Sequence, residues 1–99
     1  MKKKKVIAVD IDGILTLETT GIPFSKRTPN LENIKYVNYL YNKQNLIYLY
    51  TSRYQRDRQI TKSWLKFYKV KYHKLVLGKM KYDFLIDDKS GSSFPFTLF

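Results

Sequence analysis

Apolar residues follow two different patterns along this chain. Short continuous apolar runs lie at residues 6–9, 46–50 and 84–86, and the first and last belong to strands predicted at about 5–10 and at 83–87. A further run at 72–77 contains lysines, and we expect it to be a strand as well. The segments between the first runs carry apolar residues at helical spacing. This alternation of strands and helices predicts an α/β domain with a short, mainly parallel sheet.

Two helices are expected between the predicted strands. The first begins with Thr28 as its cap and Pro29 at its first position, where the missing proline N–H does no harm, and ends near residue 43. Its expected buried face is formed by Leu31, Ile34, Val37, Leu40 and Tyr41. The second covers about residues 55–69, and the side chains expected to face the sheet are Ile60, Trp64, Phe67 and Tyr68.

The connecting segments define a single domain over residues 1–99. Residues 14–27 have no helical period and contain Gly21 and Pro23, so we expect a loop or small hairpin there rather than an inserted cap domain. Residues 78–82 are too few for a crossover helix, so either that helix is reduced to a turn or the two flanking strands are not parallel. Residues 1–5 are expected to be a basic lead-in and residues 90–99 an irregular tail.

Composition and charge narrow the class of protein. The chain is 43% hydrophobic and 16% aromatic, which excludes a disordered protein, and no apolar run approaches the roughly 20 residues of a membrane span. The absence of cysteine excludes disulfides and thiolate metal sites, and a cytoplasmic location is the default expectation. A formal net charge of +11 favours anionic partners such as phosphorylated metabolites, nucleotides or nucleic acid.

Acidic residues are concentrated at two predicted strand ends. Asp10 and Asp12 end and follow the first strand, and Asp87 and Asp88 end and follow the last. In open α/β sheets, ligands bind at the carboxyl ends of the strands. Four of the 8 acidic residues gathered there, in a chain with 19 lysines and arginines, predict a site for a divalent cation and a phosphate.

The order of these residues resembles the haloacid dehalogenase superfamily. Its motifs have candidates in Asp10-Ile11-Asp12-Gly13, in Thr51, in Lys79 and in Asp87-Asp88. Residues 29–34, 51–53, 64–65 and 78–89 also look like the small capless members found in bacterial capsule and surface-sugar gene sets. The resemblance implies a three-layer, Rossmann-like domain without a cap and a Mg²⁺-dependent phosphatase that proceeds through an aspartyl-phosphate. Ile14 stands where the family usually has threonine.

The resemblance and the chemistry of carboxylates together assign the reacting groups. Asp10 is expected to be the nucleophile and to bind Mg²⁺ together with Asp12, through its backbone carbonyl, and with Asp87. Asp88 is expected to orient a metal-bound water or the active-site lysine. Asp12 is also expected to protonate the leaving group and then to activate water.

The remaining expected site residues bind the phosphate. Thr51 would donate a hydrogen bond to a phosphoryl oxygen, and Lys79, with Lys81 as the alternative, would balance the negative charge. Backbone N–H groups of Gly13 and Ile14 would add donors, and Ser52 and Arg53 would complete the substrate site. The only histidine, His73, is expected to be structural.

The expected function is Mg²⁺-dependent hydrolysis of a small phosphate monoester, such as a sugar phosphate or nucleotide, with no membrane partner. One alternative is a phosphatase acting on nucleic-acid ends, because a surface of charge +11 would hold a phosphate backbone. Another is a non-catalytic binding or regulatory protein that retains the fold. A capless site is open to solvent, so a second subunit could supply a lid.

Overall fold

A computed structural model describes residues 5–78 and 96–98 of the 99-residue chain. Its elements, in chain order, are β1 (Val6–Asp10), η1 (Phe24–Lys26), α1 (Leu31–Asn42), β2 (Leu46–Tyr50), η2 (Gln55–Asp57), α2 (Arg58–Phe67), β3 (Lys74–Val76) and β4 (Phe96–Leu98). The two η elements are single 3-10 turns. No helix in these ranges is long and apolar enough to span a bilayer.

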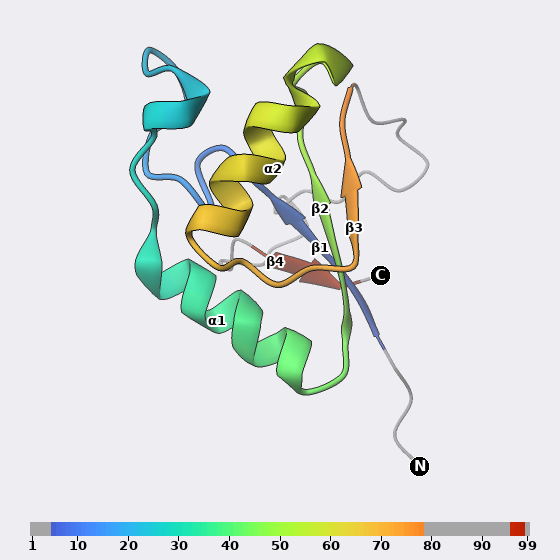
Figure 1. The fold of residues 1–99 in the computed structure, drawn as a ribbon. Coiled ribbons are helices and arrows are strands. Elements are labelled where there is room, and N and C mark those ends of the chain that lie inside the picture. Colours follow the sequence, from blue (N-terminus) through green and yellow to red (C-terminus); the bar gives the residue numbers. More distant parts are fainter. Residues whose placement is uncertain (1–4, 79–95, 99) are drawn as a thin grey trace.

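The strands form one sheet in the order β3-β2-β1-β4 (Figure 1). β1 pairs with β2 in parallel, with Val6 opposite Leu46 and Asp10 opposite Tyr50, and β2 pairs with β3 in parallel. β4 runs antiparallel to β1. The predicted Rossmann-like α/β fold with a short, mainly parallel sheet is therefore confirmed.

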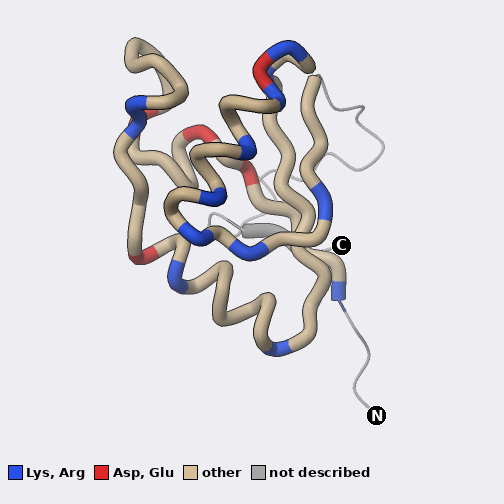
Figure 2. The backbone as a smooth tube through the Cα atoms, viewed as in Figure 1, with Lys and Arg blue, Asp and Glu red and all other residues tan. Residues whose placement is uncertain are grey.

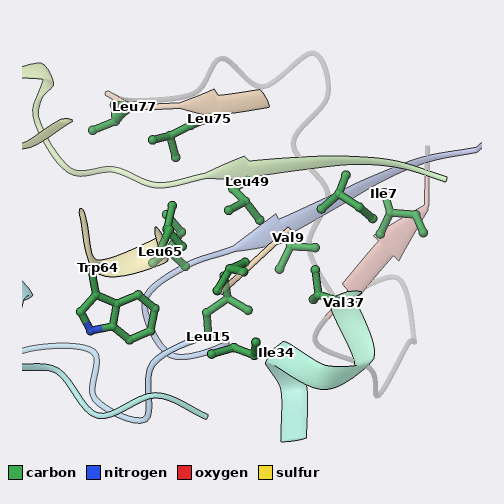
Figure 3. Packing of buried hydrophobic residues seen from close by; sticks show 13 residues of the cluster. Ile7, Val9, Leu15, Ile34, Val37, Leu49, Trp64, Leu65, Leu75 and Leu77 are labelled. Atoms are coloured by element: carbon green, nitrogen blue, oxygen red, sulfur yellow. The ribbon is translucent and has the colours of Figure 1, made fainter. Parts of the chain in front are cut away.

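Both helices cover the same face of the sheet. The chain crosses from β1 to β2 and from β2 to β3 in one direction, so crossovers of one handedness place α1 and α2 side by side on that face. Figure 3 shows side chains of both helices meeting alternate residues of the strands. The core consists of Ile7, Val9, Ile11, Leu15, Ile34, Val37, Ile47, Leu49, Trp64, Leu65, Val70, Leu75 and Leu77. Within the described ranges, no helix covers the opposite face.

The cap and one buried position of α1 differ from the prediction. Asn30, rather than Thr28, caps the helix, because its side chain accepts a hydrogen bond from the backbone N–H of Asn33 at 3.1 Å. Thr28 is held outside the helix by Glu18, which accepts bonds from its N–H and its hydroxyl. Leu31, the first helical residue, is 66% exposed rather than buried.

The buried face of α2 is rotated from the predicted one. Thr61, Trp64 and Leu65 are buried, whereas Ile60 and Phe67 are 37% and 73% exposed. The sequence predicts one helix over about residues 55–69, but its first turn is the 3-10 element η2, and the regular helix begins only at residue 58. The buried stripe therefore contains the polar Thr61, which the apolar pattern did not reveal.

The segment between β1 and α1 is the expected small hairpin. Thr16 and Pro29 form an antiparallel bridge, and the N–H of Leu17 donates to the carbonyl of Thr28 at 2.9 Å. These contacts close residues 17–28 into a loop that carries η1 and no inserted domain. Figure 1 shows this loop beside α2, above the carboxyl ends of the strands.

The C-terminal segment corrects one expectation and leaves another open. Residues 96–98 are not irregular, because they form β4 on the edge of β1 that β2 leaves free, with Ile7 opposite Leu98. The predicted strand at 83–87 lies outside the described residues, as do residues 1–4 of the expected lead-in.

Candidate active site at the carboxyl edge of the sheet

β1 delivers both predicted N-terminal carboxylates to the edge of the sheet. Asp10 is its last residue, and Asp12 lies in the tight turn that follows. In this turn the carbonyl of Ile11 accepts hydrogen bonds from three successive N–H groups, those of residues 14, 15 and 16. Gly13 has a φ of 90°, which a side chain would resist, and a Cβ there would lie 2.8 Å from the Thr19 methyl.

Asp12 is held by a buried arginine from the end of β2. Arg53 donates from Nη2 to Oδ1 of Asp12 at 2.6 Å and from Nε to Oδ2 at 3.1 Å. Its remaining Nη1 donates to the hydroxyl of Thr61 in α2 at 2.8 Å. Because a two-point contact of this kind fixes the plane of a carboxylate, Asp12 has a single defined orientation.

A second buried arginine, Arg27 of the hairpin loop, contacts the same carboxylate. Its Nη1 lies 2.7 Å from Oδ1 of Asp12, and its Nε donates to the carbonyl of Ile22 at 2.8 Å. The indole N–H of Trp64 donates to the Arg27 carbonyl at 3.0 Å and so ties the loop to α2. Arg27 is not among the predicted site residues, because nothing in the neighbouring sequence distinguishes it from the other cations of this basic chain.

Phe24 covers the arginine pair. The guanidinium carbon of Arg53 lies 3.8 Å from the centre of its ring, and that of Arg27 lies 4.8 Å away. Cations stacked on a ring in this way gain electrostatic attraction that is strongest where water is excluded. The loop thus contributes a cation and a ring to the surroundings of Asp12. We call Asp12, Arg27, Arg53 and Phe24 the Asp12 clamp.

Asp10 stands apart from this clamp. Burial is the largest influence on its carboxyl group and raises its pKa from 3.8 to about 6. This value includes a smaller upward contribution from the charge of Asp12 and downward contributions from the backbone N–H groups of Ile11 and Asp12 and from the charge of Arg53. Both ion pairs found among residues 5–78 involve Asp12 and neither involves Asp10. Of these two carboxylates, Asp10 is therefore the one that has no ion pair with any residue of the described ranges.

The predicted phosphate-binding groups are partly engaged within the protein. Thr51 is 1% exposed, and its hydroxyl donates to Oδ2 of Asp12 at 3.2 Å and accepts from the N–H of Arg53. The N–H of Gly13 donates to the Thr16 hydroxyl, and that of Ile14 donates to the turn carbonyl at 3.2 Å. These donors reach a phosphate only by exchanging a bond. Ser52 is exposed at the edge of the sheet.

The remaining predicted site residues, Lys79, Lys81, Asp87 and Asp88, lie outside the described residues. The chain approaches the site just before them, because the N–H of Gly78 donates to the carbonyl of Arg53 at 2.7 Å. Within the described ranges, no group of three or more acidic or histidine side chains gathers in a way that would hold a metal ion.

The donor set near β1 nevertheless fits part of a magnesium site. Within the described ranges, the partly buried Asp10 carboxylate forms no ion pair, and no hydrogen bond engages the backbone carbonyl of Asp12. Both are oxygen ligands of the kind that Mg²⁺ prefers, together with several waters. The Asp12 carboxylate is less suited to direct ligation because two guanidinium groups already contact it.

The single histidine is structural, as expected. Nδ1 of the His73 ring accepts a hydrogen bond from the backbone N–H of Ile47 at 3.0 Å. The backbone N–H of His73 donates to the carbonyl of Ile47 at 2.8 Å. Its ring stacks on Tyr41, with 4.5 Å between the ring centres. His73 therefore fastens the segment before β3 to β2, at the end of the sheet away from Asp10.

The protein is a Rossmann-like α/β domain with Asp10 at the carboxyl end of its first strand and Asp12 in the turn that follows. The fold is shared with a target protein from Vibrio cholerae of known crystal structure, with a TM-score of 0.70 and 25% identity over 92% of this chain and 84% of that one. It is also shared with a chain of the Pnkp1/Rnl/Hen1 complex, with a TM-score of 0.67 and 21% identity over 87% of this chain and 31% of that longer one. No protein-family model matches the sequence, and no curated protein matches it significantly. These likenesses show that other proteins of known structure share the α/β fold of this chain.

Proposed function

We propose that this protein is a Mg²⁺-dependent phosphomonoester hydrolase that acts through an aspartyl-phosphate on a small phosphorylated metabolite. The observation that carries the proposal is the contrast between its two carboxylates. Asp10 ends β1, is partly buried and forms no ion pair with a residue of the described ranges, while Asp12 is fixed by the Asp12 clamp two residues further on. A nucleophilic carboxylate must be able to approach the phosphate, and a group that transfers protons must be held in position beside it, as the arginines hold Asp12.

The chemistry assigned to this pair takes place in two steps. A carboxylate oxygen of Asp10 attacks phosphorus, the bond from phosphorus to the ester oxygen breaks, and Asp12 gives its proton to the departing alkoxide. Water then attacks the acyl-phosphate, Asp12 accepts a proton from that water, and inorganic phosphate leaves as Asp10 is regenerated. The carboxylate nucleophile thereby divides one difficult hydrolysis into two easier displacements.

A metal ion fits this proposal because both Asp10 and the phosphate are anionic. Asp10 and the backbone carbonyl of Asp12 would hold Mg²⁺ with Asp87, and Asp88 would support it, although the last two lie outside the described residues. The ion would supply electrostatic stabilisation of the phosphoryl oxygens. Lys79, or Lys81 in its place, would add positive charge.

The Asp12 clamp gives Arg27 and Arg53 a part in the proposed reaction. Asp12 cannot carry or accept a proton at Oδ1 while two guanidinium groups contact that atom at 2.7 and 2.6 Å. A phosphate is a competing acceptor for the same guanidinium fork. Binding of the substrate phosphate to Arg53 would release the Asp12 carboxylate for proton transfer, and Arg27 would keep it oriented.

The test is a screen of phosphate monoesters with and without Mg²⁺. The native chain is compared with Asp10→Asn and with Asp57→Asn, in which a carboxylate at the start of α2 is changed instead. Phosphate release that needs Mg²⁺, disappears in Asp10→Asn and persists in Asp57→Asn supports the proposal, and the preferred ester names the substrate. Equal release by the native chain and Asp10→Asn contradicts it.

Two other functions are separated by the same proteins. A phosphatase acting on nucleic-acid ends, favoured by the charge of +11, would prefer an oligonucleotide carrying a terminal phosphate over small esters. A non-catalytic binding protein is favoured by the full engagement of Asp12, and its biological effect would survive Asp10→Asn.

A further inference from the structure

A hollow on the outer side of α2 plays no part in the proposed hydrolysis. It has a volume of about 520 Å³ and is lined by Gln59, Lys62, Ser63, Lys66, Val70 and Tyr72. Four of these residues belong to α2, and their side chains are exposed. None of the described residues that line it is acidic. We call this hollow the α2 groove.

The two lysines of the groove continue a regular row of cations that begins at Arg58, just outside the groove. Arg58, Lys62 and Lys66 follow one another at intervals of four residues, and each interval advances the helix by about 6 Å. Figure 2 shows this succession of basic residues along α2. None of the three forms an ion pair with an acidic residue of the described ranges. The opposite side of α2 is fixed in the core by Trp64 and Leu65, so the cations cannot turn inward.

Arg58 and Tyr72 are close enough to affect one another. Burial raises the pKa of the Tyr72 hydroxyl, and the charge of Arg58 lowers it in part. Arg58 also donates from Nη2 to the side chain of Gln55 at 3.0 Å, and Gln55 donates to the carbonyl of Leu77. The basic row therefore extends from the middle of the groove to the carboxyl edge of the sheet.

We propose that the α2 groove binds single-stranded nucleic acid through its phosphate backbone. A row of cations at one helical turn each, with the uncharged donors Gln59 and Ser63 beside it, suits a ligand that repeats a negative charge. Rings at both ends of α2 suit the bases, because Phe67 is 73% exposed and Tyr54 is 64% exposed. An acidic peptide offers no bases to stack on these rings.

This surface does not depend on the proposed hydrolase activity. Its row of cations ends near Gln55, whose amide contacts the segment that leads from β3 to Gly78 at the candidate site. A strand bound along the groove would therefore extend toward the Asp12 clamp. Catalysis and binding can be tested separately because neither Lys62 nor Lys66 takes part in the hydrogen bonds that form the clamp.

The experiment measures binding of a fluorescent oligothymidylate by anisotropy over a range of salt concentrations. The full chain is compared with the double variant Lys62→Glu and Lys66→Glu, and with a control carrying Lys35→Glu and Lys43→Glu at exposed positions of α1 and its end. Each pair of substitutions lowers the formal net charge by four, from +11 to +7. Circular dichroism and hydrolysis of a small phosphate ester check that both variants remain folded.

The expected result is a loss of about tenfold or more in affinity for the groove variant and a much smaller loss for the control. Three phosphate contacts predict a slope of log K against log salt of about −2, which should fall to about −0.7 in the groove variant. Equal losses in both variants would show that net charge alone binds the strand. That result, absence of binding by the native chain, or equal affinity for polyglutamate would each overturn the proposal, whatever the outcome for hydrolysis.

Discussion

Replacing Asp10 with asparagine should stabilise the protein above about pH 6, although it removes the proposed nucleophile. The pKa of Asp10 rises from 3.8 to about 6 on folding because burial disfavours the charged carboxylate. A shift of about two units corresponds to about 3 kcal/mol at 1.36 kcal/mol per unit, as an upper limit for a partly exposed group. Asparagine has nearly the same shape and no charge, so it should recover most of this free energy.

The difference in unfolding free energy between the native chain and the Asp10→Asn variant should depend on pH. Below about pH 4, Asp10 is protonated in both the folded and unfolded states, and the two proteins should be equally stable. Between about pH 4 and pH 6 only the unfolded state loses this proton readily, so the free energy of unfolding of the native chain falls relative to that of the variant, and above about pH 6 the difference is constant. Urea unfolding in EDTA at several pH values measures the difference. A difference that is constant over the whole pH range, or of opposite sign, would refute the reasoning.

Glu18→Gln supplies a control with the opposite sign. Hydrogen bonds from the hydroxyl and then the N–H of Thr28 lower the pKa of Glu18 from 4.5. This carboxylate therefore contributes stability at neutral pH that is lost as the pH falls below about 4.5. The glutamine variant should be the less stable protein at neutral pH, and the gap should close in acid. Adding Mg²⁺ should narrow the Asp10→Asn difference alone, because a cation bound at Asp10 stabilises its charged form.

Three further substitutions test the site and its loop. Arg53→Lys removes the two-point contact with the site carboxylate and should cost about 2 kcal/mol of unfolding free energy, measured by urea titration. Gly13→Ala should cost more than Gly21→Ala, because both glycines have positive φ but only the first has a side chain within 4 Å of the added methyl group; equal melting temperatures would contradict this. Trp64→Phe removes the hydrogen bond to the carbonyl of Arg27, so it should lower the free energy of unfolding by about 1 kcal/mol, measured by urea titration. It should also speed proteolysis of residues 17–28, measured by limited digestion.

The sequence predicted the strands near the site with close bounds. The strands predicted at about 5–10 and at 46–50 correspond to β1 and β2 because buried parallel strands are apolar throughout and end sharply at polar residues. The same logic placed Asp10 at the end of β1. Helix faces were harder, since the 3-10 turn before α2 shifted its starting point and Thr61 entered the core to accept a hydrogen bond from Arg53.

The surroundings of Asp12 were not predictable from local pattern. Its partners come from 15 and 41 residues further along the chain, and an arginine that will be buried looks in sequence like one that will be solvated. The polar order of the motif identified Asp12 and Arg53 as site residues but not as partners. The positions of Arg27 and Phe24 depend on how the hairpin loop packs against α2, and no short sequence pattern predicts this packing.

β4, formed by residues 96–98, covers one edge of β1. β1 ends at Asp10 of the candidate site and leads into the turn that holds Asp12, and its sequence Val-Ile-Ala-Val is strongly suited to strand pairing. Opposite β2, its backbone at residues 7–9 is covered by residues 96–98. A protein shortened before residue 96 would expose an apolar, unpaired strand edge, and such edges recruit further chains. Self-association would then be the first sign of the missing segment.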